Sequence, residues 1–190
     1  MIDHDYKCVF IHSPKTGGTS MLDAFDKNWD MPDSHYLLGG MNASKNNWVD
    51  YAINYPNYLR FTIIRNPWDR FISGWKYCKT TKDRTLIDVL NNLPKEGHDY
   101  CHVTRTQKSH IHDGYEYIVQ FIIKYENFQE DFDKLCKILK KPKRRLKQLN
   151  TTEHNHYSTY FNTVESKKLF KKHFKEDIEL YNKFTSGLQK

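Results

Sequence analysis

Apolar and polar residues follow two kinds of pattern along the chain, and each pattern predicts one kind of element. Short apolar runs bounded by turn residues are typical of buried strands, and they occupy 8–13, 58–64 and 117–126. Apolar residues at helical spacing predict helices over 19–27, 67–78, 84–93, 128–140 and 162–184, and a short helix is expected near 45–54. The last helix is expected to begin at Asn162, because Asn-x-x-Glu165 resembles a capping box.

Strands that alternate with helices predict an α/β fold, in which crossover helices flank a parallel sheet. The length of 190 residues fits a single domain over 1–190. In such sheets ligands bind beyond the carboxyl ends of the strands. Two polar segments, 13–20 and 65–73, begin at predicted strand ends. We therefore expect the functional groups to lie in these two segments.

The first segment contains PKTGGTS, a turn from a strand into a helix. Such a turn directs backbone N–H groups and the partial positive charge of a helix start at one point. Gly17 and Gly18 leave room for an anion beside the backbone, Lys15 adds a charge, and Thr19 and Ser20 add hydroxyl donors. The segment predicts a site for a phosphate or sulfate group.

The order of residues in this turn differs from that of a Walker A motif. There the lysine follows the last glycine and precedes the hydroxyl that binds Mg²⁺. Here Lys15 precedes Gly17 and Gly18, and the second predicted strand ends in Arg65 rather than in an acidic metal ligand. The pattern favours an anion site built from cations and amides without Mg²⁺.

The second segment, RNPWDRFISGW, starts with Arg65 at a strand end and places Ser73 about two turns along the next helix. An arginine can bind two phosphate oxygens at once. The alternative is a structural ion pair between Arg65 and Asp69. Trp68 and Trp75 are expected in the core rather than in a stacking platform. Two anion sites at separate strand ends indicate a ligand with two separated phosphate-type groups.

Together these segments resemble the sulfotransferases that use 3′-phosphoadenosine 5′-phosphosulfate (PAPS). PKTGGTS is similar to their 5′-phosphosulfate loop, and RNPWDRFISGW is similar to their 3′-phosphate motif, R-x-P-x-x-R-x-x-S. The subgroup that the chain resembles is the carbohydrate sulfotransferases of the chondroitin and heparan sulfate type. Weaker similarity continues through 104–111, 122–135 and 149–161.

The resemblance implies a P-loop-like sulfotransferase fold and an enzyme that moves a sulfuryl group from PAPS to a hydroxyl, with PAP, the adenosine 3′,5′-bisphosphate, as product. It implies no metal, and Arg65 and Ser73 as the groups that hold the 3′-phosphate. Lys15 would also stabilise charge on the departing oxygen. The residues implied for the 5′-phosphosulfate are Lys15, Thr16, Gly17, Gly18, Thr19 and Ser20.

A base must take the proton of the acceptor hydroxyl, and histidine suits this task near neutral pH. Among ten histidines, His35 resembles the position of the catalytic histidine in the glycosaminoglycan group. His102 and Asp23 are alternative bases. His12, at a strand end, either contacts the ligand or is structural.

The charge of the chain indicates an anionic partner, because the formal net charge is +7 and the isoelectric point is about 9.1. Part of the excess is KKPKRRLK at 140–147, which is either a solvated loop or an anion contact. An acidic glycan would suit this surface as the acceptor. Two other classes stay open: a P-loop kinase with a displaced lysine, and a basic nucleic-acid-binding protein, although no nucleic-acid motif is recognised.

The cysteines and the N-terminal residues suggest neither disulfides nor secretion. Cys8 and Cys136 are expected to pack as small hydrophobes. With neither a signal peptide nor a membrane span in the pattern, we expect a cytoplasmic enzyme without a membrane partner. A zinc site is a further alternative, but the spacing of its candidate ligands matches no standard structural site. Its ligands would come from His98, Cys101, His102, His110 and His112.

Overall fold

The computed structural model describes residues 1–25, 29, 54–184 and 187–188. Within these residues one sheet of five strands has the order β1-β2-β3-β4-β5. The three central strands are parallel, as predicted, whereas β1 and β5 pair antiparallel at the edges and were not predicted. The strands are β1 Ile2–Asp3, β2 Cys8–Ile11, β3 Leu59–Ile64, β4 Phe121–Lys124 and β5 Gly187–Leu188.

The five helices predicted over 19–27, 67–78, 84–93, 128–140 and 162–184 are present and each is shorter than predicted, whereas the short helices α5 (Gly97–Asp99) and α6 (Lys108–Ile111) were not predicted. The short helix near 45–54 falls almost wholly outside the described residues, as does His35. The short turns are η1 Tyr100–Thr104, which is π-helical, and the 3₁₀ turns η2 Tyr125–Asn127 and η3 Tyr157–Thr159. The α-helices are α1 Gly18–Ala24, α3 Pro67–Tyr77, α4 Leu86–Asn91, α5 Gly97–Asp99, α6 Lys108–Ile111, α7 Phe128–Leu139 and α8 Val164–Lys183.

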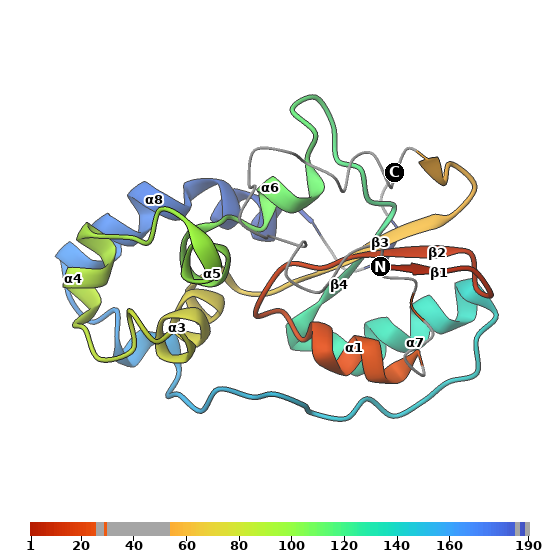
Figure 1. The fold of residues 1–190 in the computed structure, drawn as a ribbon, viewed down its shortest axis with the longest axis horizontal. Coiled ribbons are helices and arrows are strands. Elements are labelled where there is room, and N and C mark those ends of the chain that lie inside the picture. Colours follow the sequence, from red (N-terminus) through yellow and green to blue (C-terminus); the bar gives the residue numbers. More distant parts are fainter. Residues whose placement is uncertain (26–28, 30–53, 185–186, 189–190) are drawn as a thin grey trace.

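The two faces of the sheet carry separate hydrophobic clusters. On one face Phe10 and Phe61 stack with ring centroids 5.0 Å apart, and α1 and α7 cover them (Figure 1). Cys8 and Cys136 are fully buried in this cluster as small apolar side chains, as predicted. On the other face, alternate strand residues pack against Leu180 of α8. Burial on both faces explains why the central strands are continuous apolar runs.

A third cluster lies to one side of the sheet, where α3, α4 and α8 come together (Figure 1). Trp75 is buried there, and the ring of Trp68 stacks on that of Phe170 at a centroid distance of 4.0 Å. Both tryptophans therefore pack in or against the core, as predicted. This cluster fixes α3, which carries the second anion-binding candidate segment.

Two helix starts show how local capping sets the bounds. α3 begins at Pro67, and the Asn66 side chain before it accepts a hydrogen bond from the Trp68 amide at 3.0 Å. The predicted capping box at the start of α8 was wrong by one residue. The cap is Thr163 rather than Asn162, and its hydroxyl oxygen accepts from the Ser166 amide at 3.1 Å.

Candidate active site

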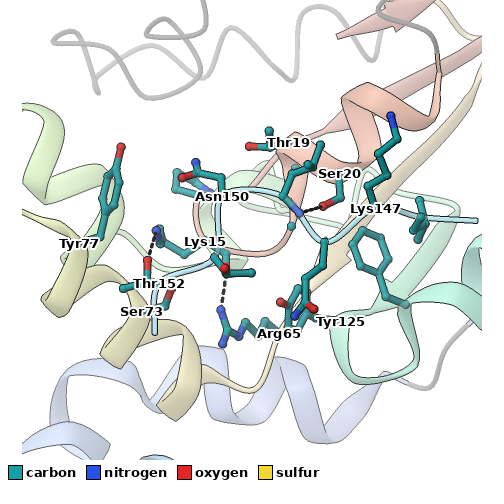
Figure 2. A pocket seen from close by; sticks show the side chains of 18 of the residues that line it. Lys15, Thr19, Ser20, Arg65, Ser73, Tyr77, Tyr125, Lys147, Asn150 and Thr152 are labelled. Atoms are coloured by element: carbon teal, nitrogen blue, oxygen red, sulfur yellow. Dashed lines mark hydrogen bonds between the residues drawn. The ribbon is translucent and has the colours of Figure 1, made fainter. Parts of the chain in front are cut away.

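A cleft of about 980 Å³ opens where the turn after β2, the second half of α3 and the long connection before α8 meet (Figure 2). The turn and α3 are the two segments singled out from the sequence. Two of the predicted site residues cannot be assigned to the cleft, because Thr16 faces the interior and His35 lies outside the described residues. The predicted residues that line the cleft are Lys15, Gly17, Gly18, Thr19, Ser20, Arg65 and Ser73.

The turn between β2 and α1 has an unusual backbone that brings the chain back on itself. Lys15 and Gly17 both have positive φ angles, of 68° and 92°. The Thr16 hydroxyl is fully buried and donates to the Ser13 carbonyl at 2.7 Å. Thr16 thus closes the turn from inside, while Lys15 on one side of it points into the cleft.

Glycine is needed at Gly18 because the His12 ring occupies the space that a side chain would fill. A Cβ there would lie 2.1 Å from Nε2 of His12. At Gly17 a Cβ would lie 2.7 Å from the Phe128 ring, at a φ that side chains rarely adopt. His12 also lines the cleft and is nearly buried. The two glycines therefore allow close packing behind the turn as well as access in front of it.

Arg65 lies at the end of β3 and reaches across to the turn. Its guanidinium donates to the Lys15 carbonyl at 3.2 Å and lies 4.5 Å from the centre of the Tyr125 ring. Its backbone is held on both sides by Gln107, whose amide oxygen accepts from the Arg65 N–H at 2.8 Å and whose amide nitrogen donates to the Arg65 carbonyl at 2.9 Å. Lys15 and Arg65 therefore belong to one wall of one cleft.

A buried polar network behind this wall was missed by the sequence reasoning. Arg70 of α3 is fully buried and donates to the carbonyls of Pro14 and Arg105 at 3.0 and 2.9 Å. Its third contact is Asp177 of α8, at 3.9 Å. The Asp177 carboxylate also accepts from the backbone amide of Gln107 at 2.9 Å. Arg70 is the second arginine of the R-x-P-x-x-R pattern, so a signal for it existed, whereas the pairing with Asp177 had none.

The connection before α8 supplies the opposite wall of the cleft. We call residues 145–154, all of which line it, the cleft strap. Its Thr152 hydroxyl accepts from Lys15 Nζ at 3.1 Å, and its Leu149 amide donates to the Ser20 hydroxyl at 3.2 Å (Figure 2). The basic run at 140–147 thus contributes its last three residues to the cleft.

The cleft is strongly cationic. Lys15, Arg65, Arg145 and Lys147 line it, against a single carboxylate among the described lining residues, that of Glu153. Burial lowers the pKa of Lys15 to about 8, and the charges of Arg65 and Arg70 act in the same direction, although Cys78 opposes them. The Lys15 ammonium also lies 3.8 Å from the centre of the Tyr77 ring. An anion in the cleft would relieve the repulsion between these cations.

Two of the alternative candidates for a base can be placed. His102 lines the cleft, and its Nδ1–H donates to the His98 carbonyl at 2.8 Å, which leaves Nε2 as the proton acceptor. Burial lowers the pKa of His102 to about 4, so the ring is neutral. Asp23 is absent from the described lining of the cleft and pairs with Lys147 at 3.2 Å.

A sheet with parallel central strands and a cationic cleft at their ends is suited to an anionic ligand of nucleotide size. The sequence model of the sulfotransferase family matches residues 1–184. The chain therefore belongs to the sulfotransferase family.

Similarity to individual proteins is weaker. An uncharacterized protein of Archaeoglobus fulgidus is 29% identical over 103 residues, which are 54% of this chain and 85% of that protein. No solved structure matches the chain. Among the described helices, none has both the length and the apolar composition needed to cross a bilayer.

Proposed function

We propose that the chain transfers a sulfuryl group from PAPS to a hydroxyl group, and that the acceptor is a carbohydrate. The observation that carries the proposal is that Lys15 and Arg65, which come from the two segments that resemble the donor-binding motifs, line one cationic cleft. Membership of the sulfotransferase family supports sulfuryl transfer. The cationic strap supports an acidic glycan as the acceptor, because the two would attract each other.

In this proposal the turn from Lys15 to Ser20 holds the 5′-phosphosulfate, with Thr16 acting through its backbone. Arg65 and Ser73 hold the 3′-phosphate. Arg65 is suited to this task because its guanidinium can bind two phosphate oxygens and Gln107 holds its backbone N–H and carbonyl. PAP would bind through the same groups.

The transfer step needs no redox chemistry and no metal. The acceptor oxygen attacks the sulfur atom and forms a new S–O bond, while the bond between sulfur and the oxygen that bridges it to the 5′-phosphate breaks. PAP leaves with the electron pair, and the hydroxyl proton passes to a base. Lys15 stabilises the charge on the departing oxygen, and the cleft holds the reactants in line.

We propose His35 as the base, on the resemblance of its position to that of the glycosaminoglycan enzymes. His102 is the second candidate, because a neutral imidazole with Nδ1 as donor lines the cleft. Replacing His35 with alanine is expected to abolish turnover while PAP binding persists. Normal turnover in His35→Ala, with loss of turnover in His102→Ala, would transfer the role to His102.

The function is tested by calorimetry with PAP, ATP and buffer alone, and then by transfer of labelled sulfate from PAPS to a panel of glycans. We expect PAP to bind without Mg²⁺, and Lys15→Ala to lower turnover by about 10²–10³-fold, the typical cost of losing one group that stabilises a transition-state charge. Lys167→Ala, an exposed lysine on α8, is the matched control. Mg²⁺-dependent ATP turnover without PAP binding would reject the proposal in favour of a kinase.

A further inference from the structure

Three side chains converge beside the cleft, and the proposed reaction assigns them no shared role. Cys78 directly follows α3, His98 lies in α5, and His102 lies in η1. One ligand atom from each lies within 4.8 Å of the other two. A thiol and two imidazoles are the donor set that borderline divalent metals prefer.

The two histidines are spaced for chelation. α5 and η1 are continuous, so His98 and His102 stand four residues apart on one helical segment. Side chains at this spacing share a face, and a pair of histidines at i and i+4 is a recurrent metal-binding arrangement. Their rings are stacked, with centroids 4.0 Å apart and ring planes 25° apart, so the two imidazoles are direct neighbours.

Hydrogen bonds already orient both rings. Nδ1 of His98 lies 2.8 Å from the carboxylate of Asp99, and Nδ1 of His102 lies 2.8 Å from the His98 carbonyl. A carboxylate and a carbonyl oxygen only accept here, so each Nδ1 carries the proton and each Nε2 keeps the lone pair that a metal needs. Imidazole ligands of metals are usually held in this way, by a carboxylate or a carbonyl on the other nitrogen.

Cys78, the residue that follows α3, completes the set. Its side chain is fully buried, and it is hydrogen-bonded to the same Asp99 that orients His98. Asp99 is held in turn by the amide and hydroxyl of Thr80. Binding a metal would release the thiol proton to solvent, and the thiolate and Asp99 would together offset the charge of the ion near Lys15.

We propose that Cys78, His98 and His102 bind a divalent transition-metal ion, with Zn²⁺ as the best match to one sulfur and two nitrogen ligands. Three protein ligands leave a fourth position for a water or another ligand, and one of the three, His102, also lines the cleft. The ion would join the end of α3 to η1, where Gly74 already packs against the His102 carbonyl. The metal proposal does not rest on the transferase activity, and an ion on Nε2 of His102 would remove that nitrogen as the alternative base. The spacing along the sequence could not show it, because Cys78 lies far from the two histidines.

The test uses the full chain after treatment with a chelator, titrated with Co²⁺ as a spectroscopic probe. We expect one ion per chain, a thiolate-to-cobalt charge-transfer band in the near ultraviolet, visible bands of tetrahedral cobalt, and loss of both when Zn²⁺ is added. PAP binding by the metal-free chain is measured in parallel. The metal result stands whether or not PAP binds, so the two proposals can fail separately.

Variants decide whether these residues are the ligands. Cys78→Ser should lose the charge-transfer band, and His98→Asn should weaken Co²⁺ binding by at least about tenfold. His98 is 42% exposed, so His98→Asn tests the site even if Cys78→Ser fails to fold. Cys136→Ser, a buried cysteine in the cluster under α7, is the control and should keep the band. Absence of the band in the unmodified chain, or a band that survives Cys78→Ser in folded protein, would overturn the proposal.

Discussion

The two segments that line the cleft present cations in different ways. The turn that carries Lys15 depends on its own backbone, with positive φ angles at Lys15 and Gly17 and an internal hydrogen bond from Thr16 to Ser13. Arg65 has an ordinary strand-end backbone and depends on partners far along the chain. Gln107 holds its peptide groups, and Gln107 is itself held by Asp177.

This difference shows which parts of a site are determined by the local sequence and which depend on distant residues. A glycine turn after a strand limits the backbone almost by itself, so its shape can be predicted from seven residues. The position of Arg65 depends on a buried network that joins β3, α3, α6 and α8. Changes to the turn should therefore act on binding, whereas changes to the network should act first on stability.

The largest effect is expected from Asp177→Asn, which removes the carboxylate charge opposite the buried Arg70. An uncompensated buried charge should lower the free energy of unfolding by about 3–5 kcal/mol. Urea unfolding followed by circular dichroism measures it. The control is Glu176→Gln on the same helix, which breaks the surface pair with Lys108 and should cost less than about 1 kcal/mol. Equal losses of unfolding free energy in the two variants would show that the buried network does not stabilise the segment that contains Arg65 and Arg70.

A smaller effect is expected from Gly18→Ala, because the added Cβ meets the His12 ring at 2.1 Å. Overpacking of this kind costs about 1–3 kcal/mol, which corresponds to roughly 5–150-fold in PAP affinity if the turn absorbs the strain. Calorimetry with PAP measures the loss. His12→Ala makes room for the new methyl group, so the double variant should bind better than the sum of the single effects allows. Strict additivity would contradict the packing argument.

The smallest effect concerns pH. Because burial lowers the pKa of Lys15 to about 8, the free cleft loses this charge as the pH rises, and an anion binds only the protonated form tightly. PAP affinity should fall by roughly tenfold from about pH 7 to about pH 9. Lys15→Arg keeps its charge over this range and should give a flat profile. A fall of the same size in Lys15→Arg would assign the titration to another group.

Much of the central fold could be predicted because it is coded by local periodicity. The three parallel strands are continuous apolar runs, and the helices that follow them carry apolar residues at helical spacing. β1 and β5 have two residues each and carry no such pattern, so pairing with β2 and β4 alone defines them. The strand expected over 117–126 shortened to Phe121–Lys124, and part of the backbone before it bonds elsewhere: the Ile118 carbonyl accepts from the Arg60 side chain.

The candidate site was predictable to a similar degree. Lys15, Gly18 and Arg65 stand in recognisable segments at strand ends, and the structure brings them to one cleft. The strap had only its charge as a signal, because a coil without periodicity does not reveal what it packs against. The partnership of Cys78 with His98 depends on how α3 and α5 pack, which local sequence does not determine.

The strap has a consequence for which anions the cleft retains. Thr152 and His154 already accept hydrogen bonds from Lys15 and Arg65, so an arriving anion exchanges these bonds for its own instead of adding to them. A small inorganic ion that replaces one of these two bonds gains little from the exchange. A long molecule with charge at both ends replaces both at once, so the cleft selects its ligand by reach as much as by charge.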